Sequence, residues 1–360
     1  MAGDLEAFAT PFVVVDLDVL ERNVATMAAR ATGLGLALRP HAKTHKCVQV
    51  AARQLAAGAS GLTVATLGEA EVFADAGCDD LFVAYPLWAD GARAERLAAL
   101  AERVRLRVGI DSAQAAGALG AAVRGRRLEV LVEVDSGHHR SGVVPAEAGA
   151  VADAASDAGV AVVGAFTFPG HGYGPGAVAG AARDEAEALM VAAESLRSCG
   201  HAVTVLSGGS TPTSAWTDAG VVTEIRPGVY VFNDAQQVAL GTCRVEDVAL
   251  TVHATATSAP DPDRLVLDAG SKVLGSDRPR WVPGHGLVVD VPDATIGWVA
   301  EHHAVVTVTG PAVGAVALGQ RVRVVPNHVC TTANLVDELV VTRGDEVVDV
   351  WPVDARGRNN

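Results

Sequence analysis

Eight short apolar runs, rich in β-branched residues, alternate with alanine-rich amphipathic segments between residues 34 and 230, and this rhythm constrains the fold more than any other feature. The segments between the runs have helical spacing and end in glycine, as helices often do. Eight strands alternating with helices predict a (β/α)8 TIM-like barrel. A doubly wound open sheet is the competing fold, but no glycine-rich turn follows the first strand. The predicted strands are residues 34–40, 61–66, 80–86, 105–110, 128–135, 162–168, 202–208 and 223–230.

The character of the sequence changes near residue 235. Short β-branched runs divided by Gly, Pro and Asp follow, without a recognisable helix, and they predict a mostly β C-terminal domain. An early strand at 12–18 comes before an amphipathic helix, and we expect this strand to join the β-domain. The expected division is an N-terminal strand region 1–20, a barrel 21–235 and a β-domain 236–360.

Composition and charge narrow the class of function. The formal net charge is −14 without a long basic run, which opposes a nucleic-acid partner. No apolar stretch reaches transmembrane length, and the N-terminus lacks the basic region of a secretory signal. The five cysteines form no CxxC pair, so neither a disulfide framework nor a zinc ribbon is indicated. We therefore expect a cytoplasmic enzyme that acts on a small molecule, with no membrane association.

Most of the unusual polar residues follow directly after predicted barrel strands. Catalytic residues in this fold come from the C-terminal ends of the strands. The loops after strands one, five, six, seven and eight therefore define the candidate site. They carry His41 and Lys43; Asp135, His138, His139 and Arg140; His171 and Tyr173; Ser207 to Thr213; and Gly228 with Tyr230.

The loop after the seventh strand, "SGGSTPT", has the composition of a phosphate site. Its two glycines let the backbone approach closely, and amides at the start of the next helix favour an anion. Loops after strands seven and eight are also where barrels usually bind phosphate. An ordinary capped turn is the alternative, because Ser and Thr favour such positions anyway. The predicted cradle consists of Ser207, Gly208, Gly209, Ser210, Thr211 and Gly228.

Lys43 stands at the mouth of the first strand, among other cations and beside apolar backbone. Such a setting disfavours the charged amine and lets it act as a nucleophile or form a Schiff base. A lysine and a phosphate cradle on one rim together indicate pyridoxal 5'-phosphate, tethered at both ends. The alternative is a solvated lysine at the start of the first helix, and we expect Lys46 to be one.

A third cluster, "VVPNHVCTTANL", lies in the predicted β-domain. His328 and Cys330 are two residues apart, so on an extended segment they point to the same side. Imidazole and thiolate together suit zinc, although a free cysteine is more often buried packing. The stretch Glu301 to His303 could supply a further ligand or could be a polar strand end.

Seven stretches occur in order and carry a family resemblance. Together they resemble the D-threonine aldolase and D-serine dehydratase family, which are pyridoxal-phosphate enzymes of the alanine racemase fold type with a barrel followed by a β-domain. The resemblance runs from about residue 10 to about residue 350, and "RPHAKTHK" and "PNHVC" are its most specific parts. The stretches are "TPFVVVDLDVLERNV", "LRPHAKTHKC", "EVDSGHHRSG", "SGGSTPT", "EIRPGVYVFND", "LDAGSK" and "PNHVCTTANL".

The resemblance implies a role for each matching residue. Lys43 matches the lysine that bonds to the cofactor, with Arg39 and His41 orienting or tuning it. His328 and Cys330 match a pair that binds a divalent metal, for which zinc is the first expectation and manganese or magnesium are alternatives. The expected catalytic residues are Lys43 and His171. The expected cofactor-binding residues are Lys43, His41, Arg140, Tyr173, Ser207, Gly208, Gly209, Ser210, Thr211, Gly228 and Tyr230.

The same resemblance implies a lyase acting on D-β-hydroxy amino acids. A cysteine in "H-x-C" resembles the dehydratases, which give a keto acid and ammonia, whereas the best-known aldolases have aspartate there. Aldolase cleavage to glycine and an aldehyde, with His171 as base, is the alternative. A metal-free racemase and a non-catalytic pyridoxal-phosphate binder also stay open. Enzymes of this fold type usually pair the barrel of one chain with the β-domain of another, so a homodimer is expected.

Overall fold

A computed structural model describes residues 3–291 and 293–360 of the chain. The chain divides into two compact units, each described here by itself. The β unit comprises the chain up to Ala25, Thr44–Gln49 and Val229–Arg356, and the barrel unit comprises Thr26–Lys43, Val50–Gly228 and Gly357–Asn360. In this division the chain passes from the barrel unit to the β unit between Gly228 and Val229. None of the helices in the described ranges is long and apolar enough to cross a membrane.

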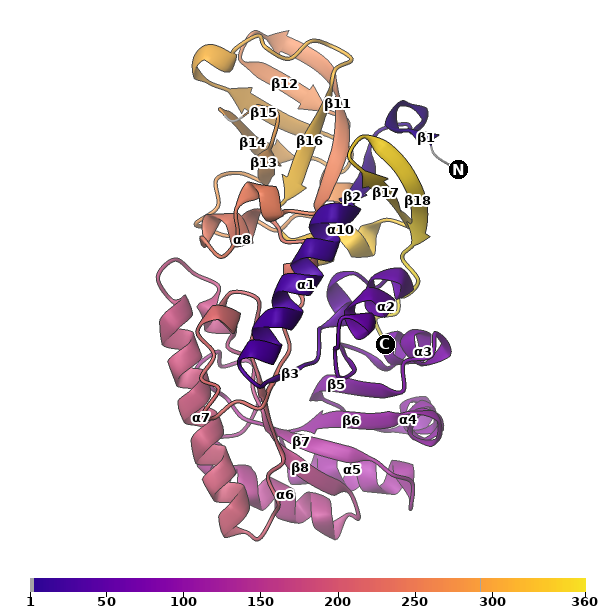
Figure 1. The fold of residues 1–360 in the computed structure, drawn as a ribbon, viewed down its shortest axis with the longest axis vertical. Coiled ribbons are helices and arrows are strands. Elements are labelled where there is room, and N and C mark those ends of the chain that lie inside the picture. The colour runs from indigo at the N-terminus through magenta and orange to yellow at the C-terminus, as the bar shows by residue number, and fades with distance from the viewer. Residues whose placement is uncertain (1–2, 292) are drawn as a thin grey trace. The chain divides into compact units, whose positions relative to one another are not determined.

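The barrel unit is built on eight parallel strands that neighbour one another in chain order (Figure 1). A bridge between His41 and Thr63 joins the first strand segment to the second and closes the sheet on itself. This arrangement confirms the predicted (β/α)8 barrel, because each predicted apolar run overlaps one observed strand. The strands are β3 (Ala37–Leu38), β4 (Leu62–Val64), β5 (Asp80–Pro86), β6 (Arg105–Ile110), β7 (Glu129–Glu133), β8 (Ala161–Phe166), β9 (Val205–Gly208) and β10 (Glu224–Ile225).

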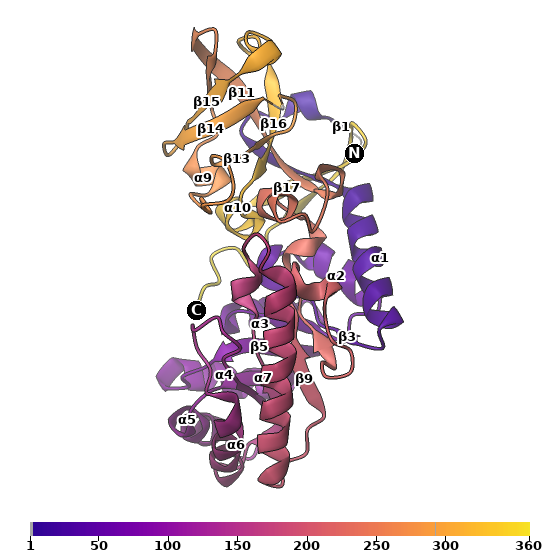
Figure 2. The ribbon, with the colours of Figure 1, turned by 90° about the vertical axis from the view of Figure 1, so that its left-hand side faces the viewer.

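Helices cover the outside of the barrel strands (Figure 2). Several begin at side-chain caps, such as Thr66 and Ser112, whose hydroxyls accept the backbone N–H three residues on. The helix expected from Thr44 begins only at Val48, whose N–H donates to Asp354 at 2.7 Å. The helices are α1 (Leu17–Gly33), α2 (Val48–Ala56), α3 (Leu67–Asp75), α4 (Gly91–Arg103), α5 (Ala113–Val123), α6 (Ala148–Asp157) and α7 (Val178–Ser198). Both α1 and α2 are divided between the two units.

The β unit holds a ten-stranded sheet in the order β1-β18-β17-β2-β11-β12-β15-β14-β13-β16. An additional pairing of β11 with β16 closes its last six strands into an antiparallel barrel. The early strand β2 lies between β17 and β11. The strands are β1 (Gly3–Asp4), β2 (Phe12–Asp16), β11 (Leu250–Asp261), β12 (Arg264–Leu267), β13 (Gly286–Val288), β14 (Ala294–Val299), β15 (Ala304–Val308), β16 (Arg321–Pro326), β17 (Glu338–Arg343) and β18 (Glu346–Pro352).

In the described part of the β unit, three short α-helices lie between strands, where the sequence indicated none. They are α8 (Ala235–Ala239), α9 (Ser271–Leu274) and α10 (Val329–Leu335). The prediction was wrong because helices of four to seven residues are too short to show an apolar period. Asp234 caps α8 by accepting the Gln237 N–H at 3.0 Å, and it also accepts the N–H of Val329 at 3.2 Å.

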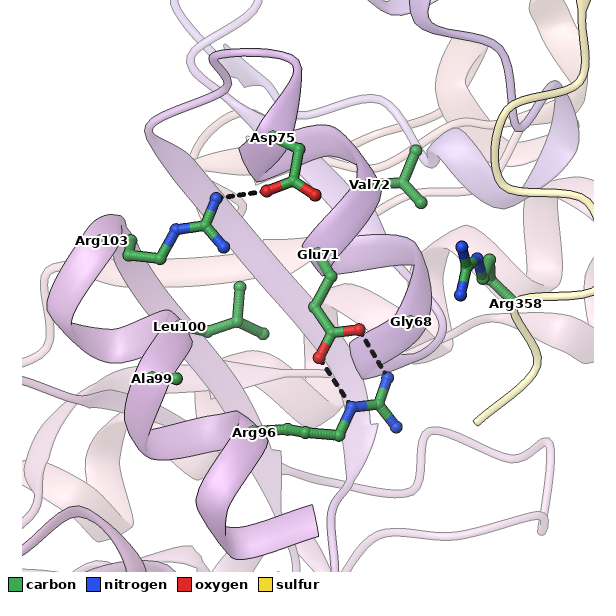
Figure 3. Close-up of a pocket in the computed structure, with 9 residues that line it drawn as sticks. All are labelled: Gly68, Glu71, Val72, Asp75, Arg96, Ala99, Leu100, Arg103 and Arg358. Atoms are coloured by element: carbon green, nitrogen blue, oxygen red, sulfur yellow. Dashed lines mark hydrogen bonds and ion pairs between the residues drawn. The ribbon is translucent and has the colours of Figure 1, made fainter. Parts of the chain in front are cut away.

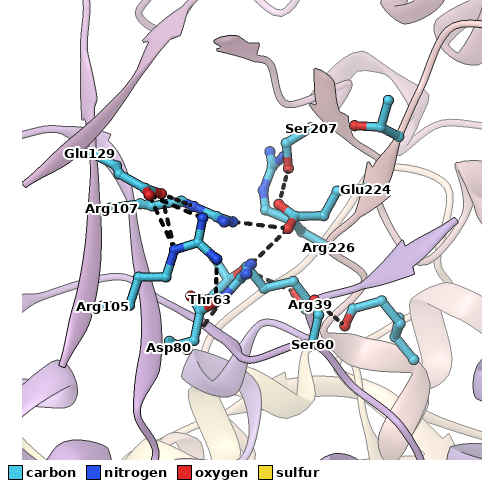
Figure 4. A network of polar contacts seen from close by, with 12 residues as sticks. Arg39, Ser60, Thr63, Asp80, Arg105, Arg107, Glu129, Ser207, Glu224 and Arg226 are labelled. Carbon is cyan, nitrogen blue, oxygen red and sulfur yellow. Dashed lines mark hydrogen bonds and ion pairs between the residues drawn. The ribbon is translucent and has the colours of Figure 1, made fainter. Parts of the chain in front are cut away.

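Buried charges fill the barrel near the N-terminal ends of its strands (Figure 4). Arg39 donates to Glu224 at 2.7 Å and to Asp80 at 2.7 Å. The expectation that Arg39 tunes Lys43 was wrong, because its side chain turns into the barrel interior, where these carboxylates neutralise it. Arg107 joins the same network through Glu224 at 3.3 Å and Glu129 at 2.8 Å. These charges pair with one another, and catalytic residues of this fold come instead from the opposite, C-terminal ends of the strands.

Candidate active site

Lys43 lies in the 3₁₀ helix η2 (Ala42–Thr44) after β3, and its amine lies over an aromatic ring. The Nζ atom is 5.9 Å from the centroid of Phe168. Within the described residues, this amine has no hydrogen bond or ion pair. A lysine amine beside an aromatic face and without a carboxylate partner fits reaction with the aldehyde of a cofactor.

Phe168, which follows β8, is the centre of a cluster and was missed in the sequence. The guanidinium carbon of Arg140 lies 5.1 Å from the centroid of the Phe168 ring. The His138 ring meets it edge-on at 5.6 Å, and the Tyr173 ring is tilted to it at 6.2 Å. One ring thus gathers residues from the loops after β3, β7 and β8. An aromatic residue directly after a predicted strand was the available signal.

Arg140 and Glu133 form the polar side of this cluster. The Arg140 guanidinium is half-exposed and lies 3.7 Å from Glu133, which is buried at the end of β7. Burial raises the pKa of Glu133, although Ser141 and Arg140 oppose the rise. Its Oε2 is buried and has no partner among the described residues. His139 points elsewhere, because its ring pairs with Asp135 at 2.6 Å and is largely exposed.

His171 lies in the 3₁₀ helix η4 (Gly170–Gly172) and has one occupied and one unoccupied ring nitrogen. Its Nε2 is 3.0 Å from a carboxylate oxygen of Asp184 on α7. Its Nδ1 is buried and has no hydrogen-bond partner within the described chain. A histidine oriented by a carboxylate, with its second nitrogen available, has the arrangement of a general base.

The loop after β9 is buried and rich in hydroxyl groups. Gly209 takes a positive φ of 76°, and a Cβ on Gly208 would collide with the Glu185 carboxylate. The Gly209 N–H donates to Glu185 at 2.5 Å. The Ser207 hydroxyl donates to Glu224 at 2.6 Å, inside the barrel. A phosphate bound here would therefore rely on other groups of the loop, such as the buried Ser210.

Glu185, on α7, is a fully buried carboxylate that the sequence reasoning missed. Burial raises its pKa to about 7, although the Gly209 N–H and the positive charge of Arg226 oppose the rise. Its Oε2 has no partner among the described residues. The sequence feature that could have revealed Glu185 is its position as a single acid on the apolar face of α7, between Ala182 and Leu189.

The titration of Glu185 predicts how stability depends on pH. In the unfolded chain its pKa returns to about 4.5, so between pH 4.5 and 7 only the unfolded state releases the proton. The stability contribution is complete below that window and is lost by about 3 kcal/mol as pH rises through it, at about 1.4 kcal/mol per pH unit. Denaturant unfolding from pH 4.5 to 8 should therefore show a flatter pH dependence for Glu185→Gln than for the wild type. The exposed Glu187→Gln on the same helix is the control, and equal slopes for both variants would contradict this account.

The remaining residues of the predicted cofactor set occupy the following positions. The backbone N–H of His41 donates to Pro227 at 3.0 Å, so that His41 and Gly228 belong to neighbouring loops of the barrel unit. Tyr230 lies in the 3₁₀ helix η6 (Val229–Val231) of the β unit and is buried. Ser210 donates its N–H to Thr213 at 2.9 Å, and Thr211 accepts at its carbonyl from Ser214 at 2.9 Å.

Lys46 differs from the expected solvated helix residue. Its side chain is buried, with 5% of the residue exposed, and its amine donates to the carbonyl of Ala355 at 3.4 Å. The backbone takes φ 51°, which is left-handed, so no helix runs through this position. The prediction was wrong because the charge is satisfied by a carbonyl of the C-terminal segment, which sequence spacing does not reveal.

His328 and Cys330 lie together in the β unit, but not on an extended segment as predicted. His328 is the N-cap residue of α10, and Cys330 is in the first turn of that helix. Their side chains nevertheless lie close enough to interact. Burial lowers the pKa of His328, but the sulfur of Cys330 and the carboxylate of Asp277 outweigh it and raise the pKa to about 11. The groups around His328 are therefore negatively charged, which favours a cation at this position.

The chemistry of this pair fits a divalent metal. One imidazole and one thiolate form a borderline-soft donor set of the kind zinc accepts. The Cys330 sulfur also contacts the Thr44 hydroxyl at 3.2 Å, and His328 contacts Asp277 at 3.2 Å. Over residues 3–291 and 293–360, no three His, Cys, Asp or Glu side chains form a ready metal set. The stretch Glu301 to His303 is an exposed turn, in which Glu301 pairs with Lys272 at 2.9 Å.

A separate hollow lies between α3 and α4 on the barrel unit (Figure 3). Its charges are paired across it, Glu71 with Arg96 at 2.6 Å and Asp75 with Arg103 at 2.5 Å. The Gly68 N–H at its edge donates to Asn360 of the C-terminal segment at 2.7 Å. Because these groups satisfy one another, the hollow offers little to a charged ligand.

Comparisons with known proteins agree with this architecture. The family "alanine racemase, N-terminal domain" matches residues 15–236, and a serine dehydratase domain matches residues 249–342. D-threo-3-hydroxyaspartate dehydratase from Delftia sp. (strain HT23) is 37% identical, covering 98% of each chain. D-threonine aldolase from Arthrobacter sp. is 36% identical, covering 97% of this chain and 93% of the relative. A solved D-threo-3-hydroxyaspartate dehydratase mutant in the metal-free form has a TM-score of 0.90 and 35% identity, covering 97% of this chain and 98% of that one.

The barrel with a lysine after its first strand, joined to an antiparallel β unit, defines an enzyme of the alanine racemase fold class. Within that class, the chain belongs to the D-threonine aldolase and D-serine dehydratase family.

Proposed function

We propose that this protein is a pyridoxal-phosphate- and metal-dependent lyase of D-β-hydroxy amino acids, and that it acts as a dehydratase. The observation that carries the dehydratase assignment is the cysteine at position 330, in the first turn of α10 next to His328, since the family resemblance associates a cysteine there with elimination. A similar full-length relative is named as a dehydratase, which agrees with this assignment.

The D-β-hydroxy amino acid class follows from what the relatives share. One relative is named for D-threo-3-hydroxyaspartate and another for D-threonine. The two molecules differ in the group on Cβ but share a D-configured α-carbon and a β-hydroxyl. A substrate of this chain is therefore expected to carry both features.

Different residues of the chain have different roles in the proposed elimination. When bound, pyridoxal phosphate supplies an electron sink for the bond broken at Cα, and a divalent metal supplies Lewis acidity toward a β-hydroxyl. The Lys43 amine accepts the α-proton, for which an amine without a carboxylate partner is suited. Arg140 and the orphaned Glu133 oxygen provide polar contacts near the Phe168 ring. His328 and Cys330 hold the metal.

Product analysis tests the proposal. The holoenzyme is incubated with D-serine, D-threonine and D-threo-3-hydroxyaspartate, before and after chelation and then with zinc or manganese restored. A dehydratase gives a keto acid and ammonia, and loses this activity on chelation. Glycine plus an aldehyde would instead establish an aldolase and remove the significance attached to Cys330.

Aldolase cleavage stays the second candidate because of His171. Its Nε2 is held by Asp184 at 3.0 Å and its Nδ1 has no partner in the described chain, as a base for the β-hydroxyl proton would require. Under the aldolase alternative, His171→Asn would abolish glycine release. Under the dehydratase proposal, the same variant keeps keto-acid formation within about tenfold, less than the 10²–10⁴-fold that a general base contributes.

The proposal also covers the identity of the metal, the oligomeric state and the location, which are argued from the family resemblance and from the chemistry of the metal ligands. We propose zinc as the bound metal, because thiolate favours it over manganese or magnesium. We also propose a homodimer and a cytoplasmic location. Elemental analysis of the purified protein, its mass by light scattering and cell fractionation test these three parts in turn.

A further inference from the structure

Asp277 contacts both His328 and the helix that carries Cys330. Its Oδ1 is 3.2 Å from the Nδ1 of His328. Its Oδ2 accepts a hydrogen bond from the Thr331 hydroxyl at 2.9 Å. The carboxylate is thus held from two sides, once by a ring and once by the first turn of α10.

The loop that carries Asp277 is itself fixed to the segment before His328. The buried Asn327 side chain donates to the carbonyl of Asp277 at 2.9 Å and to that of Gly284 at 3.0 Å. Gly275 takes a φ of 78°, and a Cβ there would lie 2.9 Å from the Thr331 methyl group. The loop therefore packs closely on α10, and its carboxylate cannot shift without moving the helix start.

A carboxylate on one ring nitrogen decides what the other nitrogen can do. A neutral imidazole that donates its Nδ1 proton to Asp277 presents the lone pair of Nε2. Metal-binding histidines commonly use such an outer carboxylate, which fixes the tautomer and raises the basicity of the ligand.

We propose that Asp277 is the positioning residue of the metal site, holding His328 so that its Nε2 binds the metal together with the Cys330 sulfur. This inference rests on the proposed function, which places a metal at these two residues. Asp277 does not itself coordinate the metal in this account. Its effect is on how tightly and in what geometry His328 binds.

Metal affinity tests the proposal without reference to turnover. Wild type, Asp277→Asn and Asp290→Asn are stripped with a chelator, and zinc affinity is measured by competition with a chromophoric chelator. Asp277→Asn should bind zinc about 10–100-fold more weakly. Asp290→Asn is the matched control, because Asp290 is a half-buried carboxylate of the same unit that pairs with Arg323 instead. It should keep wild-type affinity.

A spectroscopic readout separates positioning from general destabilisation. Cobalt(II) bound in place of zinc should show altered ligand-field absorption in Asp277→Asn and an unchanged spectrum in Asp290→Asn. If Asp277→Asn fails to fold, as judged by circular dichroism of the metal-free protein, Thr331→Val loosens the same carboxylate and carries the test with a smaller loss of affinity.

The variant His328→Ala separates failure of the proposed metal site from failure of the positioning role of Asp277. If the wild type binds zinc and His328→Ala does not, the metal site stands, and wild-type zinc affinity in Asp277→Asn would then overturn the positioning role alone. If the wild type binds no zinc, or His328→Ala binds it equally well, the proposed metal site itself fails, and the role of Asp277 falls with it.

Discussion

Replacing Lys43 by alanine is expected to lower turnover of D-β-hydroxy amino acids by about 10²- to 10⁴-fold, the loss typical of removing a proton-transfer group. Lys43→Arg should fail as well, because a guanidinium keeps the positive charge but cannot bond to the cofactor aldehyde. Steady-state rates with the substrate that the product analysis identifies measure both effects. Activity retained in Lys43→Arg would show that charge alone matters at this position.

The cofactor attachment gives an independent measurement, because the chain contains only the lysines Lys43, Lys46 and Lys272. Borohydride treatment of the holoenzyme followed by peptide mapping should find the cofactor mass on Lys43. Lys46 is buried against the Ala355 carbonyl, and Lys272 is exposed and paired with Glu301. Lys272→Ala is therefore the control variant and should keep full activity. Cofactor mass on Lys46 or Lys272 instead would contradict the assignment of Lys43 as the cofactor-binding lysine.

The barrel could be predicted from the sequence because its signal is local. Each strand of the barrel unit overlaps one of the predicted apolar runs, and α1 (Leu17–Gly33) begins and ends where the amphipathic pattern does. A parallel sheet also places the C-terminal ends of its strands at one edge, so Lys43, Arg140 and His171 could be assigned to one rim. The hydrophobic period of the sequence and the barrel topology are therefore enough to predict the strands and the rim that carries the site, without knowledge of side-chain packing.

The residues that escaped prediction depend on contacts between distant segments. Asp277 lies in an unremarkable loop, and only the fold brings it to His328, 51 positions later. Lys46 differs from its expected exposure because the C-terminal segment supplies a carbonyl to it. Glu185 had a local signal, an acid on an apolar helix face, but its partner Gly209 is set by the tertiary structure. Sequence spacing indicates which face a residue occupies, not what covers that face.

The position of Arg39 also depends on contacts that sequence spacing does not reveal, and its ion pairs contribute to stability. It sits in the cationic stretch around Lys43, yet its guanidinium bonds to Glu224 and Asp80 inside the barrel. Glu224 is buried, and although burial alone would raise its pKa, Arg39, Ser207 and Arg107 hold the pKa below its usual value. The carboxylate is therefore charged and is shared by two buried arginines (Figure 4).

Replacing Glu224 by glutamine is expected to lower the free energy of unfolding by about 3–5 kcal/mol, because the two arginines stay buried while their shared counter-charge is removed. Glu71→Gln is the matched control, since Glu71 also binds an arginine through both oxygens but does so half-exposed, between α3 and α4. Solvent screens that pair, so the control should lose at most about 1 kcal/mol. Denaturant titration of both variants measures the difference, and equal losses would mean that the buried network adds nothing beyond a surface ion pair. A larger loss for Glu224→Gln would show that the barrel depends on charge at the N-terminal ends of its strands.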